Sequence, residues 1–201
     1  MNIHHHITPK TILAALAVMA VPAAAFAAPA LTGSSTAPRT ASTATIAAAS
    51  CPSGWGSLPE ANSRMTPAPV TNVRTGRHAC FDRLVVDVGG RAAGYDVRYV
   101  KNVYTDGAGF LVPLRGGAKL QVVVHAPSYD ANGKATYRPK NNREMTNVAG
   151  YKTFRQVADA GSFEGQTTLG LGVRAQLPFR VYTLAGPGSN TRLVIDVAHH
   201  W

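Results

Sequence analysis

A six-residue segment occurs twice in this chain and constrains its fold more than any other feature. Residues 83–88 read Arg-Leu-Val-Val-Asp-Val, and residues 192–197 read Arg-Leu-Val-Ile-Asp-Val. Successive side chains of a β-strand point to opposite faces, so the second, fourth and sixth positions of each copy would share one face, and the arginine and the aspartate the other. The repeat therefore predicts two strands of the same pattern and two similar halves of one domain.

The repeat allows two arrangements of its strands. If the strands are antiparallel neighbours in register, Arg83 lies opposite Asp196 and Asp87 lies opposite Arg192. If they lie in two facing sheets, their aliphatic side chains meet across a core about 10 Å thick, and the charged side chains point outward on opposite surfaces. We expect the facing arrangement, because a duplicated half most simply supplies one such strand to each sheet. In both arrangements these four charged residues are structural polar residues.

Short segments of alternating apolar and polar residues, separated by turn residues, follow one another over residues 70–125 and again over residues 162–198. Residues 153–160 are instead compatible with a short helix. This pattern predicts a mostly β fold, an antiparallel β-sandwich of two similar sheets with at most one short helix. The expected strands are residues 70–75, 81–88, 95–101, 110–114, 119–125, 162–173, 177–184 and 192–198.

The first 50 residues differ in composition from the rest of the chain. Residues 1–27 have the pattern of a secretory signal peptide, a short apolar run followed by small residues up to Ala27. Residues 28–50 consist mainly of Ala, Thr, Ser and Pro and are expected to form a flexible linker. The folded domain is therefore expected at residues 51–201, secreted or associated with the cell wall, with no stable membrane span after signal cleavage.

The chain has two cysteines, Cys51 and Cys80. In an exported protein the simplest state of such a pair is one disulfide. An alternative is lipid attachment at Cys51, which ends an Ala-Ala-Ser-Cys sequence. The distance of Cys51 from the apolar run argues against lipidation, so we expect the disulfide.

The chain is strongly basic, with 20 Lys and Arg against 10 Asp and Glu. A basic surface favours polyanions such as nucleic acid, anionic lipid headgroups and wall polymers, although the charge can equally serve solubility alone. Export and the lack of a recognisable nucleic-acid motif argue against nucleic acid. Residues 126–160 form a long, turn-rich connection that is a candidate functional loop. Its candidate polyanion-binding residues are Lys134, Arg138, Lys140, Arg143, Lys152 and Arg155.

Several stretches make the chain resemble the exported AMIN-like domain proteins of actinomycetes. They include Gly-Trp-Gly-Ser-Leu at residues 54–58 and Pro-Phe-Arg-Val at residues 178–181, together with residues 74–78, 80–83, 94–100, 162–165 and 192–201. The resemblance covers residues 51–201 and implies a β-sandwich of two similar sheets. The related AMIN domains of cell-wall amidases and secretins bind peptidoglycan and target partners to the envelope. That role is implied here only in part, because the sequence shows no attached amidase domain.

The sequence gives little support to a catalytic or metal site. His78, Cys80 and Asp82 have the residue types of a nucleophilic site, but alternation would place all three on one strand face and a disulfide would consume the thiol. Glu164 could serve as one glycosidase carboxylate, but on a glycine-flanked strand it is more typical of a buried hydrogen-bond partner of an arginine. The adjacent histidines 199 and 200 would point to opposite faces, so we expect no metal and no cofactor.

These observations predict an exported, non-enzymatic binding module for the cell envelope. Its expected partner is a cell-wall polymer, either peptidoglycan or another anionic glycopolymer. Two alternatives from other classes stay open, a wall-active hydrolase that uses Glu164 or His78 and a protein-interaction module without affinity for glycans.

Overall fold

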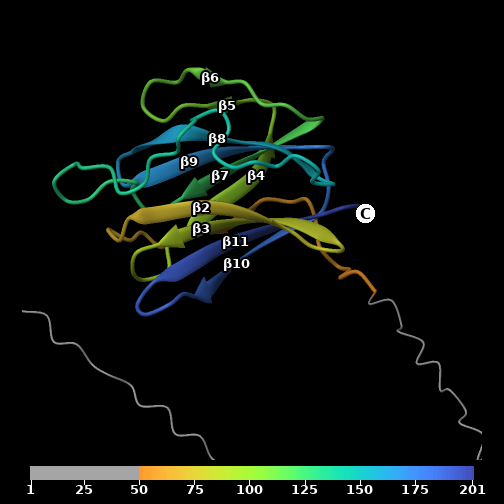
Figure 1. The fold of residues 1–201 in the computed structure, drawn as a ribbon, viewed down its shortest axis with the longest axis horizontal. Coiled ribbons are helices and arrows are strands. Elements are labelled where there is room, and N and C mark those ends of the chain that lie inside the picture. Colours follow the sequence, from red (N-terminus) through yellow and green to blue (C-terminus); the bar gives the residue numbers. More distant parts are fainter. Residues whose placement is uncertain (1–49) are drawn as a thin grey trace, which may run out of the picture. The chain divides into compact units, whose positions relative to one another are not determined.

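The computed structural model describes residues 50–201. The expected signal peptide, residues 1–27, and all but the last residue of the expected linker, residues 28–50, lie outside the described residues. Two antiparallel sheets pack face to face, as Figure 1 shows, which confirms the predicted β-sandwich. Within residues 50–201, no helix is long and apolar enough to span a membrane.

One sheet has five strands in the order β1, β4, β7, β9, β8, and the other has four in the order β10, β11, β3, β2. A small third sheet pairs β5 with β6. The strands are β1 (Glu60–Asn62), β2 (Val70–Arg77), β3 (Phe81–Val88), β4 (Tyr95–Val100), β5 (Val103–Tyr104), β6 (Leu111–Val112), β7 (Ala118–Val124), β8 (Phe154–Phe163), β9 (Gln166–Val173), β10 (Phe179–Ala185) and β11 (Thr191–Ala198).

The core lies between the two large sheets and is built from the aliphatic half of each alternating pattern. Leu84 and Val86 of β3 and Leu193 and Ile195 of β11 are at most 1% exposed. They belong to the same buried cluster as side chains of the five-stranded sheet, among them Leu120, Val122, Leu169 and Leu171. Because each buried Leu, Ile or Val contributes about 1.5–3 kcal/mol, this two-sided burial is the main force that holds the sheets together.

The expected facing arrangement of the repeat is wrong. β3 and β11 are antiparallel neighbours in the middle of the four-stranded sheet, with Arg83 opposite Asp196 and Asp87 opposite Arg192. The aliphatic faces of the two strands satisfy either arrangement equally well. The charged faces distinguish them, because only neighbouring strands let an aspartate of one copy meet an arginine of the other.

The expected short helix at residues 153–160 is also wrong, because these residues belong largely to β8. The pairing of β8 with β9 shifts register twice, between Phe154 and Gln156 and between Asp159 and Ser162. A bulge of this kind adds a residue to one strand and turns the following side chains to the other face. The two shifts therefore hide the alternation that identifies a strand in the sequence.

Residues 162–173, expected as one strand, form a hairpin instead. Phe163 of β8 pairs with Gln166 of β9, and only Glu164 and Gly165 lie between them. Both turn residues have positive φ angles, 48° and 79°, as the two-residue turns that match the twist of a hairpin require. Glu164 is therefore an exposed turn residue, and the expectation of a buried partner of an arginine is wrong.

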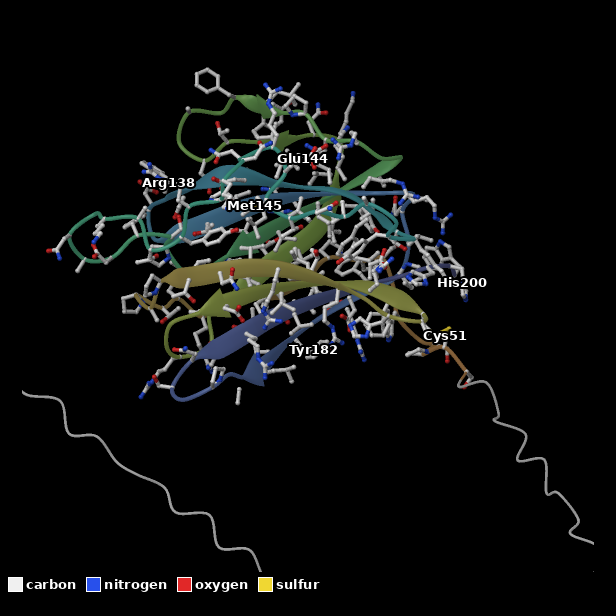
Figure 2. All side chains as sticks on the ribbon, viewed as in Figure 1. Cys51, Arg138, Glu144, Met145, Tyr182 and His200 are labelled. Carbon is white, nitrogen blue, oxygen red and sulfur yellow. A yellow bond between two sulfur atoms is a disulfide. The ribbon has the colours of Figure 1, made fainter. Side chains whose placement is uncertain are left out.

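The connection between β7 and β8 is held against the sandwich although it contains no named strand. The backbone N–H of Met145 donates to the carbonyl of Val157 at 2.8 Å, and that of Asp159 donates to the carbonyl of Asn142 at 2.7 Å. Met145 also packs against the main core. We call residues 126–153 the basic excursion; Figure 2 labels Arg138, Glu144 and Met145 within it.

Candidate polymer-binding face

The outward side chains of the four-stranded sheet form a surface of arginines and aromatic rings. The charged side chains of β3 and β11 alternate with the core-facing ones and therefore point away from the core. Side chains of β10, β2 and the segment before β1 lie beside them. We call this surface the arginine-aromatic face. Its members are Trp55, Arg74, Phe81, Arg83, Asp87, Arg180, Tyr182, Arg192 and Asp196; Figure 2 labels Tyr182 on β10.

The first charged centre of this face is Asp196, whose side chain is fully buried. Arg83 donates from Nε to Oδ1 at 2.6 Å and from Nη2 to Oδ2 at 2.9 Å. Arg180 donates from Nε and Nη2 to Oδ2 at 3.0 and 2.9 Å, and the hydroxyl of Tyr182 lies 3.2 Å from the same oxygen. Two guanidinium groups thus share one carboxylate, which leaves one positive charge in excess.

This arrangement changes the proton affinity of its members. The hydrogen bond to Asp196 raises the pKa of Arg83, although partial burial opposes that change. The pKa of Tyr182 is raised chiefly by burial and further by the negative charge of Asp196. Both side chains therefore keep their protons at neutral pH, the arginine as a cation and the tyrosine as a neutral hydroxyl.

Aromatic rings surround the two arginines of this centre. The guanidinium carbon of Arg180 lies 4.4 Å from the ring centroid of Trp55 and 4.9 Å from that of Tyr182. The guanidinium carbon of Arg83 lies 5.1 Å from the ring of Phe81. Contacts of this kind stabilise a cation over a ring by about 0.5–2 kcal/mol. These contacts hold the guanidinium groups of Arg83 and Arg180 against the aromatic rings, so that both kinds of group lie together on the same surface.

The second charged centre is Asp87. It accepts hydrogen bonds from Nε and Nη2 of Arg74, both at 3.0 Å, and from the side-chain amide of Asn72 at 3.3 Å. Arg192 lies opposite Asp87 in the strand register, but its guanidinium donates to the backbone carbonyl of Ala185. The strand register therefore correctly predicts the ion pair between Arg83 and Asp196. It does not predict the partner of Asp87, which is Arg74 of the outer strand β2.

The face combines excess positive charge with partly exposed aromatic rings. It carries four arginines and two aspartates, so it has two positive charges in excess. Val85 and Val194 also lie on this side of the sheet but are only 5% and 1% exposed, so the longer side chains around them cover the backbone. Guanidinium groups donate paired hydrogen bonds to carboxylates and phosphates, and aromatic rings stack on flat apolar surfaces.

The basic excursion places most of its expected polyanion-binding residues in solvent. Arg155, which follows the excursion, differs from them because it is half-buried. Its guanidinium donates to the backbone carbonyls of Tyr151, Lys152 and Phe154 at 2.9–3.2 Å. The exposed members are Lys134, Arg138, Lys140, Arg143 and Lys152.

The expected disulfide is confirmed. Cys51 and Cys80 are bonded, and their Cα atoms are 5.4 Å apart. The bond fastens the segment that carries Trp55 beside the start of β3, and the N–H of Phe179 donates to the carbonyl of Gly56 at 2.7 Å. The disulfide therefore helps to hold Trp55 over Arg180.

The structure separates the residues of the hypothetical nucleophilic site. His78 and Cys80 precede β3, and His78 stacks on Phe81 with ring centroids 4.5 Å apart. Asp82 is 1% exposed and points into the sandwich, so the expectation that all three side chains share one face is wrong. Within residues 50–201, no three His, Cys, Asp or Glu side chains gather in a group that could hold a metal ion.

Sequence reasoning missed Arg180, Tyr182 and Trp55 as members of the face. The alternation of β10 places Arg180 and Tyr182 on the same side of the strand, but only the pairing of β10 with β11 places them beside Asp196. The sequence signal for these residues lies in the Pro-Phe-Arg-Val and Gly-Trp-Gly stretches, whose resemblance to the family assigns them no role.

Comparison with known proteins gives one match. A model of the AMIN-like domain family matches residues 68–199, which is more than half of the chain and runs from just before β2 to just after β11. No curated protein and no solved structure matches the chain. The matched span contains both copies of the repeat and both charged centres of the arginine-aromatic face. The chain therefore belongs to the AMIN-like domain family.

Proposed function

We propose that this protein is an exported module that binds an anionic polymer of the cell envelope, with peptidoglycan as the first candidate, through the arginine-aromatic face. Membership of the AMIN-like family suggests a cell-wall-related binding module. The disulfide is compatible with a protein that works outside the cytoplasm. In this proposal residues 1–27 direct export and residues 28–50 tether the domain.

The observation that carries the proposal is the position of Arg180. Its guanidinium is held between the Asp196 carboxylate and the Trp55 and Tyr182 rings, with a side chain that is still 39% exposed. The Nε and Nη2 atoms bind Asp196, so Nη1 is left to donate to a ligand. A wall glycan with carboxylate substituents offers both partners that this surface suits, an anion for the guanidinium and a sugar ring for the aromatic rings.

The spacing of the two charged centres favours a polymer over a small molecule. Arg83 and Asp87 lie on the same face of β3, four residues apart. At about 3.3 Å per residue, the centres are separated by roughly 13 Å along the strand. A chain with repeated anionic groups could therefore contact both centres when it lies along β3 and β11.

Cosedimentation of the mature protein with purified sacculi tests the proposal. We expect binding that weakens with added salt and that falls in Arg180→Gln and in Trp55→Ala. Arg98→Gln is the matched control, because Arg98 lies on β4 in the other sheet, is 48% exposed and also contacts an aspartate, Asp96, at 3.3 Å. If Arg180→Gln and Arg98→Gln sediment equally well, the face is not the binding site.

The same sacculi report on the hydrolase alternative. Incubation with the protein should release no soluble wall fragments, because the proposal assigns binding alone to this face. Release of fragments that stops in Glu164→Gln or His78→Gln would establish the hydrolase instead. Lack of any sedimentation at low salt would favour the protein-interaction module.

A further inference from the structure

A second candidate site lies against β8, away from the arginine-aromatic face. It is a pocket of about 390 Å³ between the end of the basic excursion, β8 and the turn before β7. A neighbouring hollow of about 490 Å³ shares two of its residues, Arg115 and Glu144. Both volumes fall in the range of small-ligand pockets. Figure 2 labels Glu144 near β8.

The pocket has more positive than negative charge. Arg115 and Arg155 both line it, and Glu144 is its acidic residue. The guanidinium of Arg155 is half-buried and donates to three backbone carbonyls, which carry no net charge. Partly buried cations are normally neutralised by an anion, so this pocket favours a negatively charged ligand.

The ion pair between Arg115 and Glu144 shows which anion fits. Both carboxylate oxygens of Glu144 accept from the guanidinium, Oε2 from Nη2 at 3.0 Å and Oε1 from Nη1. Such a two-point contact matches the two oxygens of a planar carboxylate. Glu144 therefore occupies the position that the carboxylate of a ligand would take.

The ion pair can be exchanged without loss of the site. Its side chains are 59% and 35% exposed, and an ion pair between exposed side chains contributes little to stability. Arg115 is also held independently of Glu144. Its Nη2 donates to the carbonyl of Arg155 at 2.8 Å, and its backbone N–H donates to the side chain of Gln156 at 2.8 Å. The guanidinium would therefore stay in place when Glu144 turns away.

The apolar part of the remaining wall is small. Val148 and Phe154 are only 7% and 1% exposed and Tyr151 is half-buried, so they leave room for no more than a small apolar group next to Ala149. We propose that this pocket binds the free terminal carboxylate of a short peptide with a small apolar last residue, which displaces Glu144 from Arg115. This pocket shares no residue with the arginine-aromatic face, so the proposal does not depend on polymer binding by that face.

Titration of the mature protein with N-acetyl-alanyl-alanine, followed by amide chemical shifts, tests the proposal. The C-terminal amide of the same dipeptide is the control ligand, because it keeps the shape and lacks the charge. We expect the acid to shift residues around the pocket and the amide to leave them unchanged. Equal binding of acid and amide would overturn the proposal, and so would tighter binding of inorganic phosphate than of the acid.

Two variants should change the affinity in opposite directions. Glu144→Gln removes the competing carboxylate and should tighten binding up to about fivefold, the equivalent of an exposed ion pair. Arg115→Gln should weaken it about tenfold or more, because it removes the paired donors. Arg98→Gln should have no effect. If Arg115→Gln fails to fold, Glu144→Gln decides alone, and unchanged or weaker binding by that variant contradicts the displacement.

Discussion

The buried carboxylate of Asp82 links β3 in one sheet to the start of β8 in the other, where Thr153 precedes the strand and Phe154 begins it. Its Oδ2 accepts hydrogen bonds from the backbone N–H groups of Thr153 at 2.6 Å and Phe154 at 3.0 Å, and its Oδ1 lies 3.2 Å from Nε2 of His199. Asp82 and His199 are only 1% and 7% exposed. A charged group with three such partners is a structural link between the sheets, and a strand pattern alone does not reveal it.

We expect Asp82→Asn to destabilise the domain by about 2 kcal/mol or more. The asparagine oxygen can still accept from both N–H groups, but it carries no charge, and hydrogen bonds to a charged acceptor contribute about 1.5–3 kcal/mol against about 0.5–1.5 kcal/mol for neutral pairs. Urea unfolding measures the loss. His200→Gln is the control, because His200 is the exposed neighbour of His199. Equal midpoints for the two variants would show that Asp82 contributes no such link.

Glu60 should make stability depend on pH in the opposite sense to an ordinary ion-paired acid. Its carboxylate accepts from the N–H of Val181 at 3.0 Å, but burial is the larger influence and raises its pKa above the ordinary value of 4.5. The folded protein thus holds this proton more tightly than the unfolded chain. The protonated Glu60 side chain therefore stabilises the folded state. This contribution is fully present below about pH 4.5 and is lost as the pH rises through the pKa of Glu60 in the folded protein.

Glu60→Gln should therefore raise the thermal midpoint at pH 7, and the gain should shrink at pH 4, where the wild-type carboxyl is protonated. Differential scanning calorimetry at both values measures the effect. Glu164→Gln, in the exposed hairpin turn, is the control and should change neither midpoint. A gain of the same size at both values would mean that ionisation of Glu60 is not its cause.

The basic excursion should supply long-range attraction to a polyanionic wall. We expect simultaneous replacement of its exposed cations Lys134, Arg138, Lys140 and Arg143 by glutamine to weaken sacculus binding and to flatten its salt dependence. Attraction between exposed charges is screened over about 8 Å at physiological salt, so the difference should be greatest in dilute buffer. Cosedimentation across a salt series measures it, and an unchanged salt profile would show that these side chains are merely solvated.

Loss of the disulfide should affect both stability and binding. Closing a loop of 29 residues contributes roughly 3–4 kcal/mol in the chain-entropy model. The free energy of unfolding of the double variant Cys51→Ser with Cys80→Ser should fall by about the same amount. The variant should also bind sacculi more weakly, because the segment with Trp55 is no longer fastened to β3. Mass spectrometry of the unreduced mature protein checks the bond itself, since two free thiols or a lipid on Cys51 would contradict it.

The sequence was sufficient to predict the sandwich but not the neighbours of each strand. Alternation identified β3 and β11 because every second residue enters the core. The same alternation is satisfied whether the strands face each other or pair, so the choice depended on the outward charges. β8 was missed because its two register shifts interrupt the alternation.

The site was harder to predict than the fold, because its members come from distant parts of the chain. Arg83 and Asp196 are 113 positions apart, and the Arg83 and Tyr182 side chains that meet at 2.6 Å are 99 positions apart. The basic residues of the excursion were visible as a cluster in the sequence. The pocket around Arg115 was not, because its second guanidinium, that of Arg155, follows 40 positions later.

The single ion pair between Arg83 of β3 and Asp196 of β11 has a consequence for how this domain can change during evolution. The first copy of the repeat supplies Arg83 and the second supplies the buried Asp196, so the two copies cannot change independently at these positions. A mutation that removes the arginine leaves an aspartate of the other copy with one fewer guanidinium to neutralise it. A change at Arg83 in the first copy is therefore constrained by Asp196 in the second, whereas Asp87 and Arg192 are not tied to each other in this way.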